Sequence, residues 1–409
     1  MQKLLFVLPV VVCSLTLSAQ PHKESLGVFV DCGICDMNYL RNELAYIDYV
    51  RDPQLADVHL LVTRQTTGAG AARVQLDFIG KEDFEGMNQS LIYQAEPAES
   101  RDNFRRGYTR MVELGLVGYL SHTTLGDEIE VDINVADRKP VEVEDNDDPW
   151  DYWVFKVDGG GNFRIQSQQS SFNVRAGLNA NRVTEDLRIR SGVYLNQNTR
   201  TIINEEEEIS SKVHRNGAYA SVAKSLSSHW SYGMYTGLRS TTFNNIQLNV
   251  YASPAIEYSL FPYAEVARRE ITLAYRVGPS FRDYYETTIY EQDQEMLWSQ
   301  ALELAVRIRQ PWGSVFAGLE GRNFFHDFSK NRIEFNSNLN LRVYKGLALN
   351  LAASMDFIRD QLSLPKGDTS LEDVLLQQRQ LATDYEAFMS IGVSYTFGST
   401  MNNIVNTRL

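Results

Sequence analysis

Residues 269–283, REITLAYRVGPSFRD, alternate between apolar and polar side chains along their whole length. A period of two residues is that of an extended strand, in which successive side chains point to opposite faces. One face carries Ile271, Leu273, Tyr275, Val277 and Phe281, and the other carries Glu270, Thr272, Arg276, Gly278, Ser280 and Arg282. The segment therefore predicts a long strand with one apolar face and one charged face.

The same alternation recurs from Trp150 to Phe397, between clusters of turn residues. We predict strands near 151–166, 170–181, 184–198, 211–225, 229–242, 246–260, 268–285, 294–309, 313–326, 330–344, 346–360 and 384–397. They are longer than the 5 or 6 residues usual in globular proteins. An even number of long, two-sided antiparallel strands is the sequence signature of an outer-membrane barrel. The predicted fold class is membrane all-β: an antiparallel transmembrane β-barrel of about 12 strands in residues 151–398, preceded by a small α+β domain.

The arginines determine which face of this barrel points inward. All of the following fall on the polar face: Arg175, Arg188, Arg190, Arg239, Arg276, Arg282, Arg307, Arg309, Arg322, Arg332 and Arg342. Facing lipid at mid-membrane, each would cost roughly 2 to 4 kcal/mol, so the polar face should line the lumen.

Carboxylates share this face with the arginines: Glu257, Glu270, Glu303, Glu320, Glu334, Asp356 and Glu386. The predicted interior is net positive, although the whole chain carries a net charge of −13. One interpretation is a passage or pocket for anionic solutes. The other is a salt-bridged filling that closes a narrow barrel, because inward side chains fill small barrels and buried charges prefer partners.

The last predicted strand, SIGVSYTF at 390–397, has a spacing of its own. Ser390, Gly392, Tyr395 and Phe397 resemble the assembly signal in the final strand of outer-membrane barrel proteins, which the barrel-insertion machinery reads. Such proteins usually end at the final aromatic residue. Here residues 399–409 follow as an expected periplasmic tail.

The N-terminus predicts export. Residues 1–19 combine a lysine, an apolar run and small residues before the expected cut after Ala19, as in a secretory signal peptide. Cys13 would leave with it. An even, closely spaced cysteine pair in an exported chain indicates a disulfide, so Cys32 and Cys35 are predicted to be joined.

Residues 20–140 mix helical and strand periods, which predicts a periplasmic α+β domain. Strands are expected at 27–32, 56–65, 71–80 and 90–95, with one helix capped by Asp36 and another within 98–122. Residues 141–150, rich in Asp and Glu, read as an acidic linker.

The connections predict how the chain is oriented. With both ends of the barrel in the periplasm, the connections after odd-numbered strands face outward and are the longer ones. The longest, 361–383, contains an amphipathic segment that could fold over the mouth, fold into the lumen, or pack as a surface loop.

Two resemblances suggest location and partners. Residues 150–397 resemble bacterial outer-membrane β-barrel proteins, particularly the barrels of about ten to twelve strands described as salt-induced. The front domain, through YVRDPQLADVHLLV at 49–62, resembles periplasmic modules of TolB-type and lipoprotein-activator proteins. These imply the outer membrane of a Gram-negative bacterium, contact with its lipid, and a periplasmic protein or peptidoglycan partner. Nucleic acid is excluded as a partner because an acidic chain lacks the basic surface it requires.

Two enzymatic alternatives remain open beside a non-enzymatic channel or envelope interaction protein. His229 and Ser231, with Asn244 and Asn245 further on, loosely resemble the arrangement of outer-membrane phospholipases. Cys32 and Cys35 follow a strand and precede a helix, as in thiol oxidoreductases. No cofactor or metal ligand set is predicted.

Overall fold

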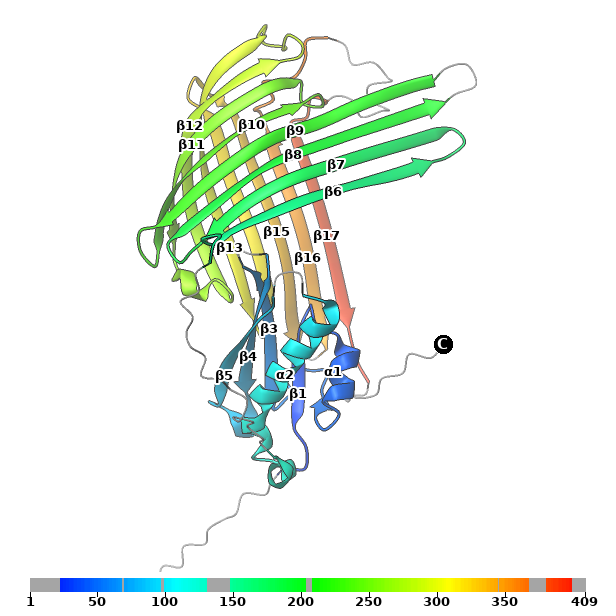
Figure 1. Cartoon of the computed structure of the whole chain (residues 1–409), viewed down its shortest axis with the longest axis vertical. Coiled ribbons are helices and arrows are strands. Elements are labelled where there is room, and N and C mark those ends of the chain that lie inside the picture. The colour runs from blue at the N-terminus through cyan, green and yellow to red at the C-terminus, as the bar shows by residue number, and fades with distance from the viewer. Residues whose placement is uncertain are drawn as a thin grey trace, which may run out of the picture.

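The computed structural model describes residues 23–67, 70–96, 99–130, 148–203, 208–344, 346–367 and 380–398. The predicted signal peptide, most of the acidic linker, the amphipathic segment of the longest connection and the C-terminal tail lie outside these ranges. The described chain forms a small N-terminal unit beneath one end of a large sheet (Figure 1).

The N-terminal unit is an α+β fold around a five-stranded sheet in the order β2-β1-β3-β4-β5, in which β1 runs parallel to β2 and β3. The other two pairings, β3 with β4 and β4 with β5, are antiparallel. The elements are β1 (Gly27–Asp31), α1 (Met37–Glu43), β2 (Asp48–Tyr49), β3 (Val58–Thr66), β4 (Ala72–Gly80), η1 (Glu82–Phe84), β5 (Asn88–Gln94), α2 (Arg101–Leu120) and η2 (Thr124–Glu128).

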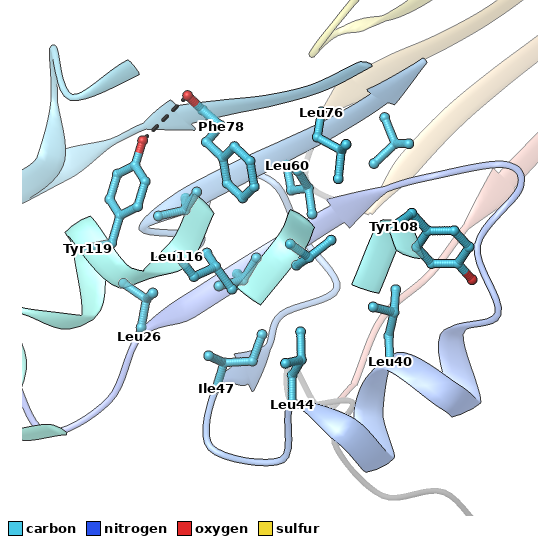
Figure 2. Close-up of a cluster of buried hydrophobic side chains, with 14 of the residues drawn as sticks. Leu26, Leu40, Leu44, Ile47, Leu60, Leu76, Phe78, Tyr108, Leu116 and Tyr119 are labelled. Carbon is cyan, nitrogen blue, oxygen red and sulfur yellow. Dashed lines mark hydrogen bonds between the residues drawn. The ribbon is translucent and has the colours of Figure 1, made fainter. Parts of the chain in front are cut away.

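Helix α2 supplies much of the core of this unit. Tyr108, Leu116 and Tyr119 lie one or two turns apart and are buried against the sheet (Figure 2). The Tyr119 hydroxyl donates to the Phe78 carbonyl at 3.4 Å, the dashed line in Figure 2. Gly115 lets the helix approach the sheet closely, since a Cβ there would stand 2.0 Å from the Phe78 ring.

The short helix α1 begins as its sequence predicts. The Asp36 side chain accepts the Tyr39 backbone N–H at 3.1 Å, which satisfies one of the free donors at a helix N-terminus. The Asp36 backbone N–H in turn donates to the Tyr108 hydroxyl of α2 at 2.7 Å. The predicted disulfide between Cys32 and Cys35 is confirmed and closes the loop between β1 and α1.

The large sheet has twelve antiparallel strands in sequence order, as predicted. They are β6 (Trp153–Ile165), β7 (Gln169–Val183), β8 (Leu187–Ile203), β9 (Glu208–Ser225), β10 (Trp230–Thr241), β11 (Ile246–Ser259), β12 (Arg269–Tyr284), β13 (Gln294–Gln310), β14 (Gly313–Phe324), β15 (Asp327–Tyr344), β16 (Leu347–Ile358) and β17 (Tyr385–Tyr395). A short helical turn, η3 (Tyr263–Glu265), occupies the connection between β11 and β12, where the sequence predicted none.

The two outermost strands, β6 and β17, are not paired with each other in the sheet order. In Figure 1, β6 to β9 run across the view whereas β13 to β17 run down it. The first and last strands therefore point in different directions. Neighbouring strands twist relative to one another, and this twist accumulates over a large sheet. The twelve strands of the predicted barrel are present, but in this conformation the sheet is open along one seam.

The polar face of the sheet is concave. Side chains from seven successive strands, β8 to β14, line a single pocket of about 440 Å³, which is possible only if the strands curve around it. The opposite face exposes large apolar side chains along most strands, including Leu302, Ile333, Ile391 and Val393. Among the described residues, no helix is both long and apolar enough to cross a membrane.

Candidate functional site on the polar face of the sheet

A row of five carboxylates crosses the polar face at one level of the sheet. Glu303, Glu320, Glu334, Asp356 and Glu386 are direct partners on the adjacent strands β13 to β17. Like charges placed directly opposite each other destabilise a sheet, so this row needs counter-charges.

Arginines from the next level of the sheet supply most of these counter-charges. Arg276 Nη2 lies 2.6 Å from Glu320 Oε2 and 3.4 Å from Glu303 Oε2. Arg322 and Arg332 both pair with Glu334, Arg332 at 3.2 Å. This band, which we name the ion-pair belt, matches the salt-bridged interpretation of the polar face in β12 to β15.

Among the other charges predicted for the interior, some have a partner and some do not. Arg307 pairs with Glu270 at 2.5 Å, and Glu257 accepts from the Tyr263 hydroxyl at 3.3 Å. Arg342 pairs outside the large sheet, as described below. Among the arginines predicted for the lumen, six make no ion pair within 4.0 Å in the described parts of the chain: Arg175, Arg188, Arg190, Arg239, Arg282 and Arg309.

The end of the sheet next to the N-terminal unit, which we name the near end, carries the short connections after β13 and β15. There Arg342, near the end of β15, donates two hydrogen bonds of 2.7 Å to the carboxylate of Asp31 at the end of β1. Its guanidinium also donates to the Pro311 carbonyl at 2.9 Å and lies 5.3 Å from the Phe29 ring centroid. A planar guanidinium matches a carboxylate in this two-bond geometry. The contact joins two residues 311 positions apart.

Behind Asp31 lies His59 of β3, whose side chain is fully buried. His59 Nε2 is 3.4 Å from Asp31 Oδ2, and the imidazole meets the Phe29 ring edge-on at 5.0 Å. Burial lowers the pKa of His59 despite the neighbouring carboxylate. Burial alone would raise the pKa of Asp31, but His59 and Arg342 together hold it below its usual value. The pairing therefore favours an ionised Asp31 beside a neutral His59, and the sequence patterns singled out neither residue.

A pocket of about 510 Å³ separates the N-terminal unit from the polar face at the near end. Arg64 of β3 and Arg309 of β13 both line it, together with the backbone beside Asp31. Arg268, in the connection before β12, approaches Asp77 of β4 at 3.9 Å. The N-terminal unit thus covers part of the near end through several contacts, of which the Asp31–Arg342 pair has the shortest polar distances.

The opposite, far end of the sheet is approached by the longest connection. Its Asp360 pairs with Arg332 at 2.9 Å and with Arg322 at 3.7 Å. Leu362 is buried in a small cluster with Leu297 of β13 and Phe324 of β14. The described part of this connection therefore packs against the polar face at the far end, whereas the amphipathic segment lies outside the described residues.

His229 and Ser231 lie at one end of β10, but the asparagines proposed to act with them lie past the other end. His229 lies just before β10, whereas Asn244 and Asn245 lie beyond its other end. Twelve residues of strand separate them, about 40 Å at 3.3 Å per residue. His229 Nδ1 instead lies 2.8 Å from the Ser259 carbonyl oxygen, and Asn245 bonds the backbone of Glu286. Neither Asn244 nor Asn245 is placed to orient this imidazole for nucleophilic catalysis.

The four residues of the assembly pattern lie on or beyond the outermost strand. Ser390 and Gly392 pair with Ala352 and Asn350 of β16. Tyr395 ends β17 and stacks on Phe397 with ring centroids 5.6 Å apart, and both rings are mostly exposed. These rings are available to another protein or to lipid.

The comparisons with known proteins find similar chains among solved structures alone. No family model matches the chain, and no curated protein matches it. Among solved structures, the NanC porin is similar at 10% identity and a TM-score of 0.29, covering 59% of this chain and 100% of that one. The translocator domain of the autotransporter NalP from Neisseria meningitidis is similar at 10% identity and a TM-score of 0.25, covering 60% and 87%.

Proposed function

We propose that the chain is a non-enzymatic outer-membrane channel for anionic solutes, with its N-terminal unit acting as a periplasmic adaptor at the near end. The observation that carries the proposal is the division of the twelve-stranded sheet into a concave charged face and an exposed apolar face. In water, the apolar face would be a patch far larger than soluble monomers tolerate. Lipid covers such a face at no cost, while the charged face surrounds water.

A channel in a membrane also requires the sheet to close between its two edge strands, β6 and β17. Unpaired backbone groups on β6 and β17 would each cost several kcal/mol in the hydrocarbon region, so a spanning sheet has to close. The two edges have similar lengths, 13 and 11 residues, and an even strand count makes them antiparallel partners. We propose that β6 and β17 pair once the chain is inserted.

Crosslinking tests this closure. One cysteine replaces Gly160 in β6, and a second is moved along β17 from Tyr385 to Tyr395 in chains whose own cysteine pair is replaced by serine. Closure predicts a disulfide at one or two adjacent positions in membranes. A flat profile, or no disulfide at any position, would mean that the strands do not meet.

Planar-bilayer recording tests the channel itself. Purified chain should give discrete conductance steps, and a salt gradient should give a reversal potential of the sign expected for anions. Arginines outside the ion-pair belt carry the excess positive charge of the polar face, so replacing Arg175 and Arg190 by Gln should shift the reversal potential toward zero. No current at any voltage would contradict an open channel.

A further inference from the structure

The concave face contains one pocket with a composition unlike that of the ion-pair belt. About 440 Å³ in volume, it is lined by Tyr194, Ala218, Tyr219, Leu238, Arg239, Asn249, Tyr251, Ser253, Pro279, Ser280, Arg282, Ser299 and Arg322. Three of these side chains are guanidinium groups, and none is a carboxylate. A water-filled site with this lining has an uncompensated positive charge.

The register of the strands explains how the guanidinium groups come together. Arg239 of β10 and Arg282 of β12 are both direct partners of Asn249 on the intervening strand β11. Strands two apart in a sheet are separated by about 10 Å, which long arginine side chains can span. With its amide turned so that the oxygen faces Arg239 Nε, Asn249 accepts from that atom at 3.2 Å. Asn249 therefore orients one guanidinium without neutralising it.

The pairing of the three arginines is incomplete. Arg239 and Arg282 have no carboxylate within 4.0 Å in the described part of the chain, and the Nε atoms of Arg282 and Arg322 are buried without a hydrogen-bond partner. Arg322 is shared with Glu334 and Asp360, whereas Arg282 lies 5.3 Å from the Phe324 ring centroid. Buried guanidinium groups are normally matched by anions. Two unmatched charges beside a third form an arrangement that a dianion would neutralise.

Glycines keep the pocket open. A Cβ at Gly217 would stand 2.6 Å from the Tyr194 hydroxyl, and one at Gly237 would stand 2.9 Å from the Tyr251 hydroxyl. The tyrosine rings therefore lie over glycine positions, which leaves their hydroxyl groups and the serine hydroxyls at the pocket wall. Hydroxyls in this setting suit a hydroxylated ligand, and the volume falls within the range of small-molecule sites.

We infer that this pocket binds a small hydroxylated organic dianion through Arg239, Arg282 and Arg322. This rests on the proposed function, because the ligand has to reach the concave face. It goes further by placing a defined solute site beside the ion-pair belt and by specifying the charge of the solute. Arg239 and Arg282 each offer a guanidinium to one anionic oxygen pair, and Arg322 offers a third contact shared with the belt.

Calorimetry on the full chain in detergent tests the inference without requiring a current. Glucose 6-phosphate, a hydroxylated dianion, should bind; glucuronate, a monoanion, should bind more weakly, and glucose should not bind. Removing one charged hydrogen bond costs about 10- to 150-fold in affinity, so Arg239→Gln and Arg282→Gln should each weaken binding by that factor. Arg175→Gln, on the same face but outside the pocket, is the matched control and should leave binding unchanged.

Equal binding of glucose and glucose 6-phosphate, or unchanged binding in the Arg239→Gln/Arg282→Gln double variant, would overturn the inference. If these variants fail to fold, phenylglyoxal modification of the unaltered chain decides instead. Glucose 6-phosphate should slow modification of Arg239 and Arg282 but not of Arg175. If the ligand slowed modification of all three arginines equally, or of none, the inference would be overturned. Binding without any current would refute the channel but retain the site, while current without binding would do the reverse.

Discussion

Breaking the Asp31–Arg342 pair should release the N-terminal unit from the near end of the sheet. The pair has two bonds of 2.7 Å, and its side chains retain 20% and 26% exposure. Breaking a fully buried pair costs about 3 to 5 kcal/mol, and an exposed pair about 0 to 1 kcal/mol. At this intermediate burial we expect about 2 kcal/mol for Arg342→Gln, which is a roughly 30-fold change in the ratio of docked to undocked molecules.

Spin labels on Glu113 of α2 and Glu185 before β8 can report this ratio as the share of short and long distances. Both positions are exposed, so the labels should not disturb packing. Asp31→Asn, Arg342→Gln and the double variant form a cycle whose coupling energy should be about 1 to 2 kcal/mol. Arg342→Lys should be intermediate, since an ammonium keeps the charge but cannot form the two-bond fork.

Arg268→Gln is the matched control for this experiment. Arg268 also joins the sheet to the N-terminal unit, but its distance to Asp77 is 3.9 Å, so its loss should cost less than about 0.5 kcal/mol. A coupling energy below about 0.3 kcal/mol, or equal effects of Arg268→Gln and Arg342→Gln, would refute the view that the Asp31–Arg342 pair holds the two units together.

Three further predictions concern the N-terminal unit. Because burial lowers the pKa of His59, the unfolded state binds the proton first as the pH falls below 6.5. Stability should then fall by at most about 1.4 kcal/mol per pH unit, and urea midpoints that do not change between pH 7.5 and 5.5 would contradict this. Replacing Cys32 and Cys35 by Ser removes a four-residue loop constraint worth about 2 kcal/mol, measurable as a lower urea midpoint; no change would argue against it. Gly115→Ala should cost about 1 to 3 kcal/mol, because the added methyl group would overlap the Phe78 ring 2.0 Å away; thermal unfolding of this variant and of Gly118→Ala, where the space is open, separates overlap from helix propensity.

Local patterns were sufficient to predict the elements of the fold. Strict alternation in residues 269–283 and 331–344 predicted β12 and β15, and Asp36 predicted the start of α1. The disulfide followed from two cysteines three positions apart. In each case the determining contacts lie within one strand, one turn or one helix end, so neighbouring residues contain the information.

From the sequence, we could predict which face of the sheet carries the candidate site, but not how its charges pair. Alternation placed Arg239, Arg282 and Arg322 on the polar side, but it could not show that Arg322 is shared with Asp360 of a distant connection while the other two lack a carboxylate. Pairing between strands depends on register, and register depends on where every turn falls along the sheet. A period of two residues contains no information on the register of neighbouring strands or on the positions of the turns.

By itself, then, the sequence determined that twelve two-sided strands follow a small α+β domain, because side-chain alternation is a property of each strand alone. Only the tertiary structure decided which charges neutralise one another. The Asp31–Arg342 contact spans 311 positions, and the carboxylate row exists only once five strands lie in register. Electrostatic partnership depends on distance in space, and that distance is set by how the strands curve and where the N-terminal unit docks.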